Sequence, residues 1–164
     1  MDYLEIIKNK IVDKESITKL VANLRLKNRS IVFTNGCFDL IHKGHVTYLA
    51  QAASLGNCLI VGINSDTSVQ KLKGENRPIQ DEHSRALIMA SLHVVSAVII
   101  FEEDTPLNLI QLIEPDYLVK GGDWETSNIV GAKEVQLYGG KVLNIPFIEG
   151  YSTTSIEAKI KQSK

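Results

Sequence analysis

Two histidines three residues apart are the side chains of this sequence best suited to chemistry. His42 and His45 follow a β-rich run at 30–35 and precede a helical pattern at 46–55, so they fall where a loop opens into a helix. Residues three apart on a helical turn face the same side. The first turn of a helix also offers free backbone N–H groups and the positive end of the helix dipole. The pair therefore predicts a site where two imidazoles converge on one anion.

Nucleotidyl transfer is the reaction that such a site suits. A phosphate or hydroxyl oxygen attacks the α-phosphate of a nucleoside triphosphate, and the protein mainly aligns the reactants and stabilises the developing negative charge. A phosphate nucleophile requires no general base, in keeping with a sequence that contains no evident Ser-His-Asp or Cys-His arrangement. Gly36 and Gly44 would let a nucleotide approach the backbone. The alternatives are surface histidines without a role, or a partial metal site with only Asp39 as a third ligand.

Three further segments carry groups that phosphates bind. The loop at 71–80 contains Lys73 and Arg77 around Gly74, which we favour as phosphate ligands, although a charged loop can also be a solvated connection. The segment 150–156 is rich in hydroxyl groups before a helical pattern, which helix capping alone would also explain. The run VKGGDW at 119–124 follows a β-rich segment and is either a wall of the nucleotide site or a plain turn.

Other side chains near these motifs allow more than one role. Arg85 is either an exposed helix charge or a clamp on a substrate phosphate. Asp39 is a ligand for a substrate hydroxyl or Mg²⁺, or a cap of its own loop. Cys37 fits best as a small residue beside the nucleotide. Since no acidic cluster is evident, we predict no metal site built by the protein, and Mg²⁺ held chiefly by the triphosphate.

Alternating strands and helices must position these groups. Five β-rich runs, at 30–35, 58–64, 97–101, 116–120 and 141–145, are separated by helical segments. This alternation predicts an α/β fold, a doubly wound, Rossmann-like sheet of five parallel strands with helices on both faces. Ligands of such sheets bind outside the carboxyl ends of the strands. We expect a helical extension at 1–29, with Asp13 or Ser16 as a cap, and a nucleotidyltransferase domain at 30–164.

The composition excludes several classes of protein. The 164 residues are 44% hydrophobic and 23% charged, which is ordinary for a globular domain. A net charge of −1 argues against binding to nucleic acid or membrane through bulk charge. The most apolar stretch, 94–101, is too short to span a bilayer. Two cysteines without a second pair favour a reducing, cytoplasmic location.

The motifs together resemble the cytidylyltransferase-like nucleotidyltransferase superfamily, through the pattern G-x-F-D-x-x-H-x-G-H at 36–45. Within it, VKGGDW at 119–124 and YSTTSI at 151–156 are similar to the adenylyltransferases that form ADP-D-glycero-β-D-manno-heptose for the lipopolysaccharide core. The resemblance implies that ATP and heptose 1-phosphate give ADP-heptose and pyrophosphate. Many relatives carry a fused sugar kinase, so a separate kinase would have to supply heptose 1-phosphate here.

The resemblance also implies roles for individual residues. The catalytic set is His42, His45 and Lys73, and Asp39, Arg77, Arg85 and Trp124 are expected to bind the sugar phosphate. Nucleotide-binding residues are expected to be Asn35, Gly36, Cys37, Phe38, Gly44, Gly121, Asp123, Ser152, Thr153 and Thr154. The rival functions are a cytidylyltransferase acting on glycerol 3-phosphate or a similar small phosphate, and a non-catalytic nucleotide-binding module. The sequence leaves open whether the protein is a homodimer.

Overall fold

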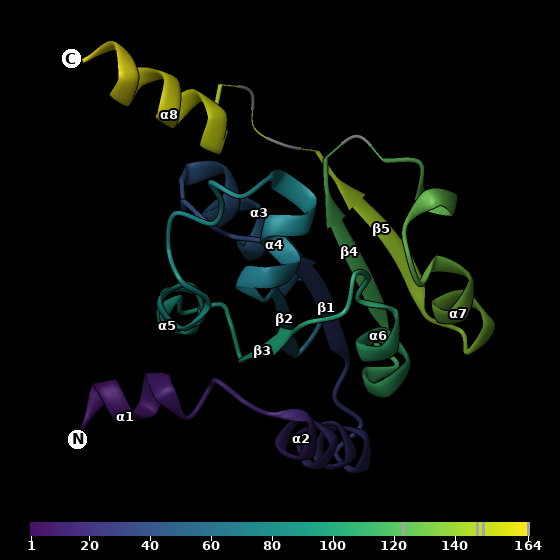
Figure 1. Ribbon diagram of the computed structural model, residues 1–164. Helices are drawn as coiled ribbons and strands as arrows, with labels where there is room; N and C mark the ends of the chain where they lie inside the picture. Colours follow the sequence, from purple (N-terminus) through teal and green to yellow (C-terminus); the bar gives the residue numbers. More distant parts are fainter. Residues whose placement is uncertain (123, 147, 149, 164) are drawn as a thin grey trace.

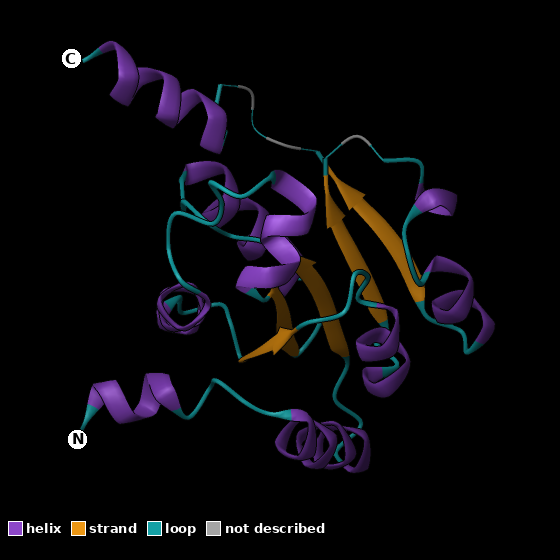
Figure 2. Cartoon of the chain, in the orientation of Figure 1, coloured by secondary structure: helices purple, strands orange, loops and turns teal. Residues whose placement is uncertain are grey.

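A parallel β-sheet forms the centre of the molecule in the computed structural model, which describes residues 1–122, 124–146, 148 and 150–163 (Figure 2). The strands are β1 (Ile31–Gly36), β2 (Cys58–Asn64), β3 (Ala97–Phe101), β4 (Tyr117–Gly121) and β5 (Lys141–Ile145), in the order β3-β2-β1-β4-β5. Because the chain runs outward from β1 in both directions, β1 and β4 flank the point where the strand order switches. The predicted five-stranded, doubly wound fold is confirmed.

Helices cover both faces of this sheet (Figure 1). They are α1 (Tyr3–Lys8), α2 (Lys14–Leu26), α3 (Lys43–Ala53), α4 (Asp66–Lys73), α5 (Glu82–Ser91), α6 (Leu107–Ile113), α7 (Ala132–Leu137) and α8 (Thr153–Gln162), with a 3₁₀ turn at Thr126–Asn128. Side chains of α2, α6 and α7 pack on the face that contains Phe33, whereas side chains of α1, α3 and α5 pack on the face that contains Val32. Neighbouring residues of one strand thus pack into the cores on opposite faces of the sheet, because successive side chains of a strand point to opposite faces.

The N-terminal extension consists of two helices that pack onto the sheet. Asp13 caps α2, since its carboxylate accepts the Ser16 N–H at 2.7 Å, so Ser16 is the donor and not the cap. Between the helices, Val98 N–H donates to Lys10 at 2.8 Å and Val12 N–H donates to Val98 at 2.9 Å. These bonds cover the free edge of β3. No helix in the part of the chain that the structure describes is long and apolar enough to cross a membrane.

Candidate active site

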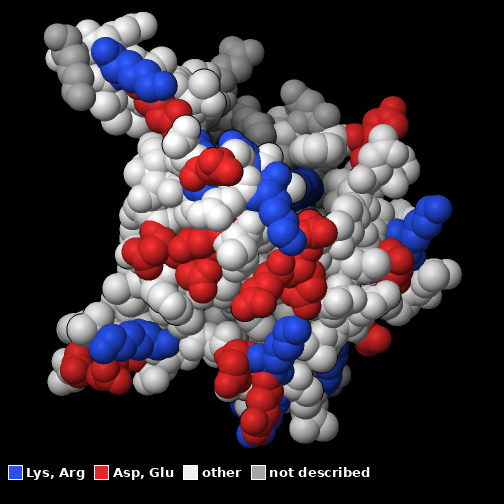
Figure 3. Space-filling view, in the orientation of Figure 1, with Lys and Arg blue, Asp and Glu red and all other residues white. Residues whose placement is uncertain are grey.

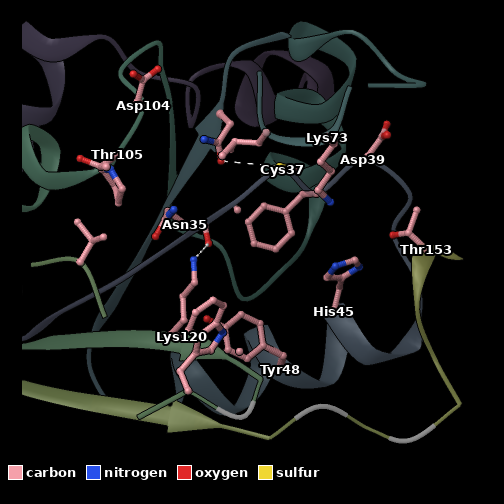
Figure 4. Close-up of a pocket in the computed structure, with 18 residues that line it drawn as sticks. Asn35, Cys37, Asp39, His45, Tyr48, Lys73, Asp104, Thr105, Lys120 and Thr153 are labelled. Atoms are coloured by element: carbon pink, nitrogen blue, oxygen red, sulfur yellow. Dashed lines mark hydrogen bonds between the residues drawn. The ribbon is translucent and has the colours of Figure 1, made fainter. Parts of the chain in front are cut away.

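A cavity of about 490 Å³ opens at the carboxyl ends of the strands, next to the switch between β1 and β4 (Figure 4). Its volume falls in the range of small-molecule sites. The lining combines the end of β1, the first turn of α3, the ends of β2, α4 and β4, the loop after β3, and the start of α8. It comprises Asn35, Gly36, Cys37, Phe38, Asp39, His45, Tyr48, Asn64, Leu72, Lys73, Asp104, Thr105, Pro106, Lys120, Gly121, Trp124, Val130 and Thr153.

The two predicted histidines stack on each other at the N-terminus of α3. His42 is the residue before the helix and His45 lies in its first turn, and their ring centroids are 3.9 Å apart with an interplanar angle of 29°. The Phe38 ring meets the His45 ring edge-on, with centroids 5.5 Å apart. His45 lines the cavity, whereas His42 lies beside it. Both Nδ1 atoms are buried without a hydrogen-bond partner among the described residues, so each imidazole retains capacity to bind a ligand.

The two glycines of this loop allow its rings to pack. A Cβ on Gly44 would lie 3.0 Å from the His42 ring, and a Cβ on Gly36 would lie 3.1 Å from the Phe38 ring. Phe38 itself has a left-handed backbone with φ of 48°, which is uncommon for a bulky side chain. Because Gly36 and Gly44 have no side chain, the Phe38 ring and the His42 ring have room to pack at these positions.

The electrostatics of the site keep the histidines uncharged near neutral pH. Burial lowers the pKa of His42, and the pKa of His45 falls to about 4 through burial, the neighbouring His42 and the positive charge of Lys73. A neutral imidazole has one N–H donor and one acceptor nitrogen. A bound polyanion would oppose these effects and favour the protonated form, in which both nitrogens donate.

The basic loop at 71–80, whose first three residues belong to α4, is held by ion pairs of Arg77. Arg77 contacts the Asp39 carboxylate at 2.6 Å and the Glu157 carboxylate of α8 at 2.8 Å. Asp39 is buried, and it also accepts the N–H groups of Ile79 and Gln80 at 2.9 and 3.0 Å. Asp39 thus anchors the neighbouring loop at 71–80, a role that the sequence did not predict, and Arg77 already has two anionic partners. Lys73 lines the cavity.

Arg85 has neither of the environments expected for it. Its side chain is 0% exposed and donates to the backbone carbonyls of Gln80, Cys37 and Asn64 at 3.0, 2.6 and 2.8 Å and to the Asp66 carboxylate at 2.8 Å. The prediction of an exposed charge is wrong, and a side chain without exposed surface is not available to clamp a phosphate. The reason is that carbonyl groups from separate segments converge on the guanidinium.

The remaining predicted residues divide into those that reach the cavity and those that do not. Thr153, Gly121, Cys37 and half-exposed Trp124 line it. Ser152 caps α8 by accepting the Ser155 N–H at 3.0 Å, and neither Ser152 nor Thr154 lines the cavity. The prediction for Asp123 falls outside the described residues.

Several lining residues were not among the predicted site residues. Asn64 ends β2, Asp104 and Thr105 follow β3, and Lys120 lies at the end of β4. Each occurs at the carboxyl end of a predicted parallel strand, where ligands of such sheets bind. That positional rule would have found them, because it applies to every strand and not only to those followed by a motif.

The family is settled by comparison with known proteins. A cytidylyltransferase-like family model matches residues 33–159, which include the histidines, the basic loop and the start of α8. The chain belongs to the cytidylyltransferase-like family. The predicted resemblance and the nucleotidyltransferase class are thereby confirmed.

Curated relatives match almost the whole chain. It is 51% identical over 152 residues to the bifunctional protein HldE of Trichlorobacter lovleyi, covering 93% of this chain and 31% of that protein. It is 50% identical over 157 residues to the bifunctional protein HldE of Wolinella succinogenes, covering 94% of this chain and 32% of that protein. The chain thus spans about a third of the length of these relatives.

Solved structures share the fold. A lipopolysaccharide core biosynthesis protein from Thermoplasma volcanium is 28% identical with a TM-score of 0.59, and the match covers 76% of this chain and 99% of that one. A pantoate-beta-alanine ligase from Francisella tularensis also has a TM-score of 0.59, at 18% identity, over 92% of this chain and 76% of that one. At that identity the second match shows the fold alone.

Proposed function

We propose that this protein forms ADP-D-glycero-β-D-manno-heptose and pyrophosphate from ATP and D-glycero-β-D-manno-heptose 1-phosphate. The observation that carries the proposal is the identity of about half the residues, over nearly the full chain, to one third of HldE proteins. The bifunctional name of those relatives agrees with a second activity in the part that this chain does not match. The similarity to a lipopolysaccharide core biosynthesis protein from Thermoplasma volcanium supports the same area of metabolism.

The cavity supports a direct displacement on the α-phosphate. His45, Lys73 and Thr153 reach it from three different elements, and His42 stacks behind His45. In the proposed reaction, His42 and His45 donate to the α-phosphate as negative charge grows on it, and Lys73 and the Thr153 hydroxyl group bind the β- and γ-phosphates. Donors already fixed in place cost no reorganisation when the charge develops, which is why they accelerate the reaction.

Nucleoside triphosphates bind Mg²⁺. We propose that the phosphate oxygens of ATP supply most of the ligands of this ion. Among residues 1–122, 124–146, 148 and 150–163, no group of three or more His, Cys, Asp or Glu side chains could hold a metal ion. Of the two carboxylates among the described residues that line the cavity, Asp39 binds Arg77, and Asp104 forms an exposed pair with Lys71 at 3.0 Å. Bound Mg²⁺ would neutralise phosphate charge.

Pyrophosphate release tests the assignment and its rivals. Purified protein with Mg²⁺ should release pyrophosphate with ATP and heptose 1-phosphate far faster than with CTP and glycerol 3-phosphate. Faster release with the second pair would transfer the assignment to a cytidylyltransferase. Nucleotide binding without turnover on a panel of sugar and polyol phosphates would indicate a binding module.

We further propose a cytoplasmic location, because ATP is abundant there and the two thiols stay reduced. Size-exclusion chromatography measures whether the protein is a homodimer.

A further inference from the structure

Lys120 is a cation inside the cavity that the motifs of the site do not explain. It lies next to the last residue of β4, and its Nζ donates to the backbone carbonyl of Asn35 at 3.4 Å. Figure 4 shows its side chain rising from the sheet toward Asn35, with Tyr48 nearby. The ammonium group therefore lies between the ends of β1 and β4, at the switch in strand order.

The described residues around Lys120 leave its charge largely uncompensated. Within the part of the chain that the structure describes, no carboxylate lies within ion-pair distance of its Nζ, although the Lys71, Arg77 and Arg85 side chains all have such partners. An ammonium group has three donors, and the single bond to Asn35 is long. Burial lowers the pKa of Lys120. A bound anion would offset that cost and complete the hydrogen bonding of this group.

The positions of the other polar groups in the cavity indicate which anion Lys120 would bind. In Figure 4, His45, Lys73 and Thr153 lie toward one end of the cavity, whereas Lys120 and Asn35 lie toward the other. In the proposed reaction the first group holds the α-phosphate and the pyrophosphate that leaves. An in-line displacement places the attacking and leaving oxygens on opposite sides of the α-phosphorus. The attacking phosphate must therefore enter from the end that contains Lys120.

We propose that Lys120 binds the phosphate group of the acceptor sugar phosphate and holds its attacking oxygen in line with the α-phosphate of the nucleotide. This inference rests on the proposed function, because it needs an acceptor that attacks through a phosphate. An oxygen of the acceptor phosphate forms the new bond to the α-phosphorus, the bond to the bridging oxygen breaks, and pyrophosphate leaves with the electron pair. Lys120 keeps its protons throughout, since an ionised phosphate needs no base.

Replacement of Lys120 by an uncharged residue should affect the binding of the two substrates differently. In K120M the KM for heptose 1-phosphate should rise at least tenfold, while the Kd of α,β-methylene-ATP, measured by calorimetry, stays within twofold of wild type. K120R should recover much of the loss, which a packing role would not allow. The matched control is K141M, since Lys141 is an exposed lysine at the opposite end of the neighbouring strand β5. It should leave both quantities within twofold.

Two results would overturn the inference. One is a K120M enzyme with unchanged KM for heptose 1-phosphate, and the other is a loss confined to nucleotide affinity. Thermal denaturation confirms that each variant is folded, and K120Q replaces K120M should the latter not fold.

A binding experiment keeps the inference testable even if heptose 1-phosphate is not the acceptor. Inorganic phosphate is titrated into protein saturated with α,β-methylene-ATP. The wild type should bind it, and K120M or K120Q should bind it at least tenfold more weakly. Equal binding, or no binding by the wild type, would refute a phosphate site at Lys120. Absence of turnover by the wild type with heptose 1-phosphate would instead refute the proposed function.

Discussion

In the proposed reaction, the two stacked histidines act as donors to a charge that is absent before the substrates bind. The rings of His42 and His45 stack on each other, and both side chains have a lowered pKa because they are partly buried. Two imidazolium rings at this distance would repel each other. Their neutral state in the free protein therefore permits the stack, and a bound polyphosphate supplies the negative charge that favours protonation.

Replacement of either histidine tests their role in the transition state. His42→Ala or His45→Ala should lower turnover by about 100-fold or more, since each loss removes a donor aimed at developing charge. Pyrophosphate release under saturating substrates measures the effect, and far-ultraviolet circular dichroism checks the fold. His83→Ala is the control, because His83 is exposed on α5 and does not line the cavity. A double His42, His45 variant that retains near wild-type turnover would contradict the mechanism.

The low pKa of His45 also predicts how stability depends on pH. An unfolded chain protonates this histidine near 6.5, whereas the folded protein does so only near 4. Between these values the unfolded state binds more protons, so the free energy of unfolding decreases as the pH falls from about 6.5 toward 4. Urea denaturation at pH 7 and pH 5 measures this decrease, and His45→Gln should make it smaller. An unchanged difference between the two pH values would show that His45 does not contribute.

At the scale of elements, the sequence predicted the strands well because each is a short β-rich run. β2, β3 and β5 have the predicted bounds, and β1 and β4 begin and end one residue later than predicted. The environment of Arg85 was not predictable, because three carbonyl groups from 37, 64 and 80 meet it only in the folded chain. Lys120 was missed for a different reason: it lies at the carboxyl end of a predicted strand, but site residues were predicted from the motifs and not from this position.

Arg85 connects α5 to the ends of β1 and β2, so its removal should affect stability. Arg85→Met leaves the buried carbonyls of Cys37, Gln80 and Asn64 without this donor, which should lower the free energy of unfolding by about 3–5 kcal/mol. Urea denaturation measures the loss. Lys14→Met, which breaks the exposed pair with Glu103, should cost no more than about 1 kcal/mol. A stable Arg85→Met protein with a raised KM for the sugar phosphate would restore Arg85 as a substrate ligand.

Lys73, at the end of α4, should show the opposite behaviour. It is exposed and lines the cavity, and exposed charges contribute little to folding. Lys73→Ala should therefore reduce turnover and raise the KM for ATP at least tenfold, with a change in the free energy of unfolding below about 1 kcal/mol. Initial rates at varied ATP, together with urea denaturation, test both parts. Unchanged kinetics would show that Lys73 is only solvated.

At the scale of the whole molecule, the site must attract polyanions without help from the net charge. The chain carries −1, and Figure 3 shows acidic and basic side chains interspersed over this face of the surface. A surface of mixed sign produces little long-range attraction for a triphosphate. We therefore expect binding to depend on local groups, namely Lys73, Lys120 and the first turn of α3.

The N-terminal segment contributes to the same packed unit from both sides of the sheet. It passes along the free edge of β3, so that Ile7 of α1 packs on one face and Ile17 of α2 packs on the other. Figure 1 shows both helices below β3, on the side away from α8. None of its residues lines the cavity. The segment is therefore expected to support the sheet without contacting either substrate.

Truncation of Ile17 tests whether the N-terminal segment contributes to stability without contributing to activity. The side chain is 0% exposed and packs in the core with Ile31 and Phe33, so Ile17→Ala should lower the free energy of unfolding by about 2–5 kcal/mol. Leu26→Ala on the same helix is the matched control, because Leu26 is 86% exposed and its loss should cost no more than about 0.5 kcal/mol. Urea denaturation measures both values. At a temperature where Ile17→Ala is fully folded, its kcat and both KM values should lie within twofold of wild type, since the strand ends that carry the site are held by other contacts. A folded Ile17→Ala protein with a large loss of turnover would show that the N-terminal segment also shapes the active site.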